Sequence, residues 1–213
     1  DSITVYLTGW SGGAQNVTRY MLLRQALADS IPIRMAVSLN PCAYTFCTDS
    51  LQGVQMRYPY GINGRLYGVG VEFICDEHVK MYYNENYAVM IGTADFGCYC
   101  TGTTSLDSVL CAQGANRYER AKNFYAFSDS DAVNRGTALK WQYAEIPGIG
   151  HDPWAMYGAK ADTADTSTIA ETLLFDSPYY PPVVFPPTAE FSWSFADSLD
   201  SLCNTVQFNA TCA

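Results

Sequence analysis

The feature that most constrains the fold is a glycine-rich turn near the start of the sequence, Gly9 to Gly13 (GWSGG). An apolar run rich in β-branched and aromatic residues, at 3–7, comes before this turn and predicts a buried strand. Strong helix formers without proline follow at 14–28 and predict a helix. Glycines allow the backbone to turn sharply from a strand into a helix without steric clashes. The pattern therefore predicts a strand–turn–helix unit with Ser11 at the start of the helix.

The remainder of the chain alternates apolar strands with helices. Further strands are predicted at 33–39, 88–91 and 141–146. Helices are predicted at 77–83, at 105–127 with an interruption near Gly114, at 153–160 and at 167–175. Near-continuous apolar strands that alternate with helices are typical of a mostly parallel sheet with helices on both faces. The predicted fold class is therefore α/β.

Two segments stand outside this alternation. Residues 41–73 form a long irregular stretch with several turn signals, and such loops often form lids or pocket walls. Residues 177–213 begin with a proline-rich run, which predicts an extended path over the surface. We interpret 1–176 as one core domain with a lid-like insertion at 41–73, and 177–213 as a C-terminal extension.

Ser11 is a candidate nucleophile because it would project above the sheet at a helix N-terminus. Free N–H groups at such a terminus stabilise developing negative charge, and the backbone N–H of Gly12 is a candidate oxyanion-hole donor. The alternative is a packing turn in which Ser11 only caps the helix. A serine needs a base, and the chain has 2 histidines. His78 lies in a polar stretch, whereas His151 follows a predicted strand, where α/β sheets place their sites, so His151 is the candidate base.

A triad also needs a carboxylate that orients the imidazole. Asp95 ends the third predicted strand and gives the order Ser, Asp, His along the chain. The alternatives are Asp129 and Asp131, which we expect in a loop, and Asp152, which we expect to cap the following helix. We therefore choose Asp95 as the acid. This chemistry requires no cofactor and no metal.

The sequence contains 8 cysteines and two glycosylation sequons, a combination typical of a secreted protein. Short spacings suggest three disulfides: Cys42 with Cys47, Cys203 with Cys212, and Cys111 with either Cys98 or Cys100. A zinc site built from Cys75, His78, Cys98 and Cys100 is the alternative. We expect Asn16 to be buried on the helix predicted at 14–28 and therefore unglycosylated, which makes Asn209 the better candidate for glycosylation.

Charge argues against a nucleic-acid partner, and hydropathy argues against a membrane span. The net charge of −9 opposes binding to phosphate backbones, so we expect no nucleic-acid partner. The apolar runs have the length of strands and fall well short of the roughly 20 residues of a membrane span.

Several sequence blocks together resemble a known superfamily. They are GWSGGAQNVTRY at 9–20, VSLNPCAYTF at 37–46, YPYG at 58–61, IGTAD at 91–95, CAQGANRYER at 111–120 and PGIGHDPWAMY at 147–157. Over about residues 3–160 the chain is similar to the C-terminal two-thirds of serine α/β-hydrolases, and more narrowly to a group of secreted α/β-hydrolase-like proteins. The resemblance implies Ser11 as nucleophile, Asp95 as acid and His151 as base. Trp10 departs from the family, in which His is common at this position.

The same resemblance implies strands before the nucleophile elbow and a second oxyanion donor from one of their loops. We therefore expect an N-terminal segment, in the same protein or as a second chain, to complete the sheet. The predicted activity is hydrolysis of a small-molecule or lipid ester through an acyl-enzyme intermediate. The alternative is a catalytically inactive hydrolase-fold protein that serves as an extracellular structural or interaction module.

Overall fold

The computed structural model describes residues 4–27, 29–62, 65–66, 69–70, 74–102 and 104–176. The predicted Cys203–Cys212 disulfide, the Asn209 sequon and the extension at 177–213 lie outside these ranges.

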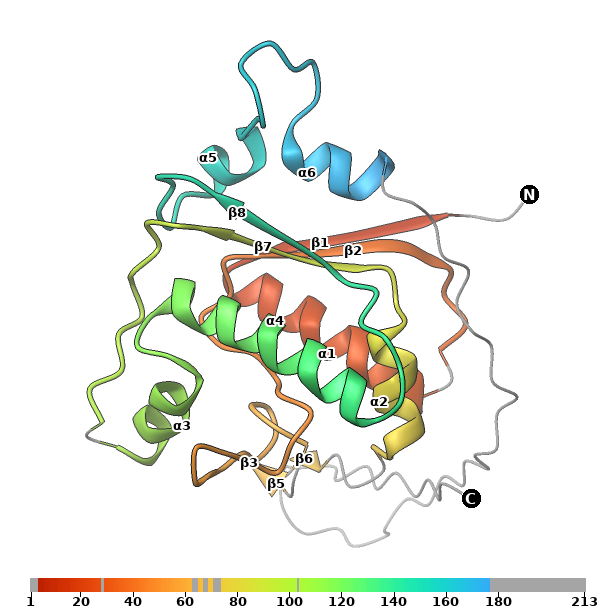
Figure 1. Cartoon of the computed structure of the whole chain (residues 1–213), viewed down its shortest axis with the longest axis vertical. Helices are drawn as coiled ribbons and strands as arrows, with labels where there is room; N and C mark the ends of the chain where they lie inside the picture. Colours follow the sequence, from red (N-terminus) through yellow and green to blue (C-terminus); the bar gives the residue numbers. More distant parts are fainter. Residues whose placement is uncertain are drawn as a thin grey trace, which may run out of the picture.

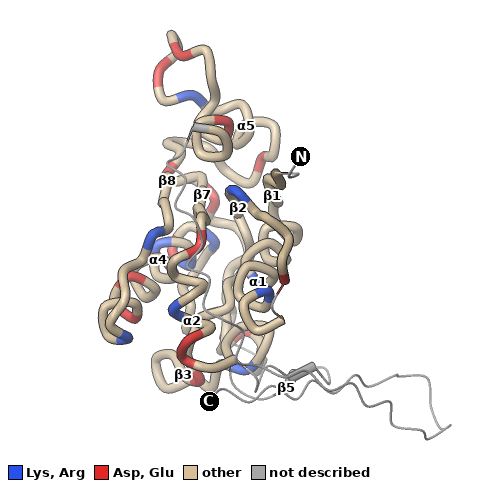
Figure 2. Tube along the Cα trace, turned by 90° about the vertical axis from the view of Figure 1, so that its right-hand side faces the viewer, with Lys and Arg blue, Asp and Glu red and all other residues tan. Residues whose placement is uncertain are grey.

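A four-stranded parallel sheet forms the centre of the molecule (Figure 1). The strands are β1 (Val5–Trp10), β2 (Ile33–Leu39), β7 (Tyr87–Gly92) and β8 (Gln142–Ile146), in the order β1-β2-β7-β8. Figure 2 shows this order across the sheet. Because all neighbouring pairs are parallel, the carboxyl ends of the four strands lie at one edge of the sheet.

Helices cover both faces of this sheet, as the sequence predicts (Figure 1). One face carries α1 (Gly12–Ala26), α2 (Asp76–Tyr83) and α4 (Arg117–Asn134), with α3 (Ser105–Gln113) packed against α4. The other carries α5 (Pro153–Gly158), α6 (Ile169–Glu171) and a π-helical turn, η1 (Thr172–Asp176). The central strands β2 and β7 are therefore buried on both sides, which explains their continuous apolar sequences.

The helix predicted at 105–127 is two helices, and the second extends to Asn134. Gly114 separates them with a φ of 151°, and the side chain of Asn116 accepts a hydrogen bond from the Glu119 N–H at the start of α4. As a result, Asp129 and Asp131 lie on a helix and not in the expected loop.

The insertion at 41–73 contains short hairpin strands in its described parts. They are β3 (Ser50–Leu51), β4 (Val54–Gln55), β5 (Arg65–Leu66) and β6 (Val69–Gly70). Tyr44, Phe46 and Met56 from this segment are buried in the core on the α4 side of the sheet, and the ring of Tyr44 stacks on that of Phe124. A role for the segment as a lid stays a prediction.

The predicted Cys42–Cys47 disulfide is wrong. Cys42 bonds to Cys98, with 6.2 Å between the Cα atoms, and Cys47 is a free, buried thiol. Cys42 follows β2 and Cys98 follows β7, so strand adjacency brings together residues that are 56 positions apart. The Cys100–Cys111 disulfide is present, which settles the partner of Cys111. Cys75, Cys98 and Cys100 are all in disulfides, so the zinc alternative loses three of its four ligands.

Among the helices of the described ranges, none combines the length and apolar character that crossing a membrane requires.

Candidate functional site

Ser11 lies in a strained turn between β1 and α1. Its φ of 55° is in the left-handed region, which is unusual for a residue with a side chain. The Ser11 N–H donates to the Leu39 carbonyl at 2.9 Å, which fixes the turn beside the end of β2. A Cβ atom at Gly9 would lie 2.5 Å from the carbonyl carbon of Gly13, so the close approach of strand and helix requires glycine there. The strained turn at Ser11 matches the strand–turn–helix unit that the sequence predicts, and it has the conformation of a nucleophile elbow.

His151 lies on the loop after β8, and the end of β7 holds this loop in place. The Ala94 N–H donates to the Ile149 carbonyl at 3.0 Å, and the Gly148 N–H donates to the Thr93 hydroxyl at 2.9 Å. A side chain at Gly92 would clash with the Ile149 carbonyl, so glycine is needed for the loop to approach β7.

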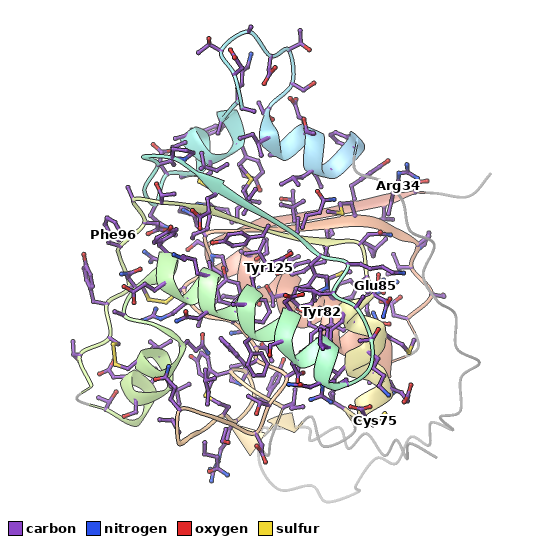
Figure 3. The ribbon with its side chains drawn as sticks, in the orientation of Figure 1. Arg34, Cys75, Tyr82, Glu85, Phe96 and Tyr125 are labelled. Atoms are coloured by element: carbon purple, nitrogen blue, oxygen red, sulfur yellow. A yellow bond between two sulfur atoms is a disulfide. The ribbon has the colours of Figure 1, made fainter. Side chains whose placement is uncertain are left out.

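The fold brings the three predicted residues together. The Nε2 atom of His151 lies 3.0 Å from the Ser11 Oγ atom, and its Nδ1 atom lies 2.7 Å from the Asp95 Oδ2 atom. Asp95 is only 1% exposed, whereas Ser11 and His151 are partly exposed. The arrangement fits the tautomer in which Nδ1–H donates to the Asp95 carboxylate and Nε2 accepts a hydrogen bond from the Ser11 hydroxyl. Phe96, labelled in Figure 3, marks the edge of the sheet where this site lies.

Two residues that the sequence analysis missed hold Asp95. The Arg117 guanidinium donates to Asp95 Oδ1 at 3.1 Å, and the Asn40 amide donates to Asp95 Oδ2 at 2.9 Å. These bonds offset the cost of burying a carboxylate. In the sequence, Asn40 lies in the NPC block and Arg117 lies in the QGANRYER block. Both blocks belong to the resemblance, which assigns them no role. The four central strands therefore each lead into one residue of the network: Ser11, Asn40, Asp95 and His151.

Trp10 also touches the site. Its ring lies against the imidazole of His151, with centroids 4.4 Å apart and an interplanar angle of 31°. Gly12 is exposed and is the first residue of α1. Its N–H therefore belongs to the first turn, whose amides have no carbonyl partners within the helix.

The rejected candidates have other roles. His78 lies on α2, where its Nδ1 atom accepts a hydrogen bond from the Cys75 N–H at 3.3 Å. Asp131 accepts hydrogen bonds from Tyr83 and Arg135, and Asp152 caps α5 by accepting one from the Ala155 N–H. Asn16 is exposed on α1, so the expectation that it is buried is wrong. It lies on the side of the helix opposite to the buried Ala14, Val17 and Thr18.

The parallel sheet, its helices on both faces and the site at the strand ends have the form of the C-terminal part of an α/β-hydrolase. Two solved structures share this fold. The poly(3-hydroxybutyrate) depolymerase LpqC from Bordetella parapertussis is 28% identical, with a TM-score of 0.60 over 84% of this chain and 51% of its own. Poly(aspartic acid) hydrolase-1 from Sphingomonas sp. KT-1 is 22% identical, with a TM-score of 0.58 over 73% of this chain and 52% of its own.

The chain thus spans about half the length of each neighbour. No family model and no curated protein matches the sequence.

Proposed function

We propose that this protein is a serine hydrolase that cleaves ester bonds through an acyl-enzyme intermediate. The observation that carries the proposal is the pair of consecutive hydrogen-bond contacts from Ser11 to His151 and from His151 to Asp95, at 3.0 and 2.7 Å. The neighbour at 28% identity is described as a depolymerase of a polyester, which supports ester chemistry.

In the proposed reaction, the Ser11 Oγ atom attacks the ester carbonyl carbon while its proton passes to His151 Nε2. The tetrahedral intermediate collapses, and the same proton leaves with the departing alcohol. Water then attacks the acyl-Ser11 ester, giving one proton to His151, and the acid is released as that proton returns to Ser11. Asp95 stays ionised and stabilises the imidazolium that forms twice in each cycle.

The oxyanion would accept a hydrogen bond from the Gly12 N–H. We propose that a second donor comes from a further segment beside β1, which has a neighbouring strand on only one side within the described residues.

We also propose that the protein is secreted. The Cys42–Cys98 and Cys100–Cys111 disulfides support this, because such bonds persist in oxidising compartments.

Hydrolysis of nitrophenyl esters of increasing acyl length by the full-length protein tests this proposal. We expect Ser11→Ala and Asp95→Asn each to lower kcat by about 10⁴-fold or more. Asp129→Asn is the matched control, because Asp129 is an exposed carboxylate on α4, and it should retain full activity. Absence of hydrolysis across the series would favour the inactive structural module instead, and full activity in Ser11→Ala would reject the mechanism.

A further inference from the structure

Asn40 uses every polar atom of its side chain to join the two loops of the site. It follows β2, is 0% exposed, and has a φ of 48°. Its Nδ2 atom donates to Asp95 Oδ2 at 2.9 Å and to the Gly150 carbonyl at 3.0 Å. Its Oδ1 atom accepts from the Gly92 N–H at 3.2 Å. A fully satisfied, fully buried amide of this kind is held in one orientation.

The three partners of Asn40 are placed so that one side chain controls both the acid and the base. Gly92 ends the strand that leads to Asp95, and Gly150 immediately precedes His151. The two amide hydrogens therefore point to the acid itself and to the backbone of the base. The Asn40 N–H also donates to the Met90 carbonyl at 3.1 Å, which anchors the residue to β7.

Asparagine suits this position for two physical reasons. Its short polar side chain tolerates the left-handed backbone conformation better than most residues do. Its amide supplies two donors and one acceptor at the same time, whereas aspartate supplies no donor and would place a second negative charge beside Asp95.

We propose that Asn40 is a positioning residue that fixes the Asp95 carboxylate and the His151 loop in the orientation that holds the imidazole against Ser11. This inference rests on the proposed serine hydrolase function. Arg117 binds the other carboxylate oxygen and leaves Oδ2 to His151 and Asn40. Without Asn40, the Asp95 carboxylate can rotate about its Cβ–Cγ bond. The backbone before His151 also loses the hydrogen bond from the Asn40 amide to the Gly150 carbonyl.

Kinetics of Asn40→Gly and Asn40→Asp in the full-length protein give the first test. Glycine keeps the backbone conformation and removes all three side-chain bonds. We expect kcat on a nitrophenyl ester to fall about 100-fold in both variants while KM changes little, because geometry and not binding is lost.

Gln113→Met provides the matched control for the loss of a buried amide. Gln113 is 0% exposed, and its amide accepts from the Tyr44 N–H and donates to the Tyr44 carbonyl, both at 2.9 Å, without touching the triad. It should lower the melting temperature, as the Asn40 variants should, but leave kcat unchanged. A normal kcat in Asn40→Gly, or an equal loss of kcat in Gln113→Met, overturns the proposal.

A second readout does not depend on catalysis. In an NMR spectrum of the ¹⁵N-histidine-labelled protein, the imidazole signals of His151 are those that disappear in a His151→Gln variant. We expect a slowly exchanging, downfield Nδ1–H signal from His151 that is present in Gln113→Met and lost in Asn40→Gly. If the native protein cleaves no ester but shows this pattern, the proposed function fails and the positioning role stands. If Asn40→Gly keeps the signal, or the native protein lacks it, the positioning role is overturned.

Discussion

At the residue scale, the contact between the Trp10 and His151 rings has a chemical consequence for the proposed reaction. The indole and imidazole rings are 4.4 Å apart. An aromatic face attracts a cation through its quadrupole, and His151 becomes an imidazolium whenever it takes the Ser11 proton in the proposed mechanism. In the proposed mechanism, the Trp10 ring therefore lies against the positive charge that forms on the base.

We predict that Trp10→Leu lowers kcat/KM for a nitrophenyl ester by about 3- to 30-fold, the range that corresponds to a lost cation–π contact. Trp10→Phe retains a ring and should fall between the native protein and Trp10→Leu. Equal activities for the Phe and Leu variants would show that the ring contributes only bulk. Initial rates over a range of substrate concentrations are sufficient for this comparison.

The residue scale is also where the sequence carried the least information. The proximity of Ser11, Asp95 and His151 was predictable because each follows a strand and the expected chemistry restricts the residue types. The Asn40 and Arg117 contacts with Asp95 were not, because they join residues 55 and 22 positions apart and depend on the exact path of two loops. The Cys42–Cys98 disulfide was missed for the same reason. Sequence spacing favours pairs of cysteines that are close in the chain, whereas the order of the strands in the sheet determines which cysteines come into contact.

At the element scale, β1 differs from the two interior strands of the sheet. β2 and β7 are buried almost throughout, whereas β1 alternates between partly buried and exposed residues, and Tyr6 is 36% exposed. The sequence predicted all four strands from their apolar runs, but this difference depends on sheet order. An unpaired edge of this kind is a template for another strand.

We predict that a further segment of the full-length protein pairs with the free edge of β1. In a strand paired on one side only, alternate amides point to solvent, whereas in an interior strand every amide is bonded. Hydrogen exchange should therefore be slow at consecutive amides between Tyr6 and Thr8. Fast exchange at every second amide in this stretch would contradict the prediction and would leave the second oxyanion donor without a source.

At the scale of the whole molecule, one property of parallel sheets assembles the site. Because all four strands run in the same direction, their ends place Ser11, Asn40, Asp95 and His151 along a single edge. Helices on both faces bury the middle of the sheet, whereas Ser11 and His151 at that edge are partly exposed. The fold class was predictable from periodicity alone, whereas the substrate depends on loop shapes that periodicity does not encode.

Reaction of the full-length protein with a fluorophosphonate probe, followed by mass spectrometry of its peptides, shows whether Ser11 is an activated nucleophile. The reagent forms a stable bond only with a serine whose hydroxyl is activated by a base. We predict one modified peptide, with the label on Ser11, and no labelling in Ser11→Ala. A native protein that remains unlabelled, or a label on another residue that persists in Ser11→Ala, would contradict the claim that Ser11 is an activated nucleophile.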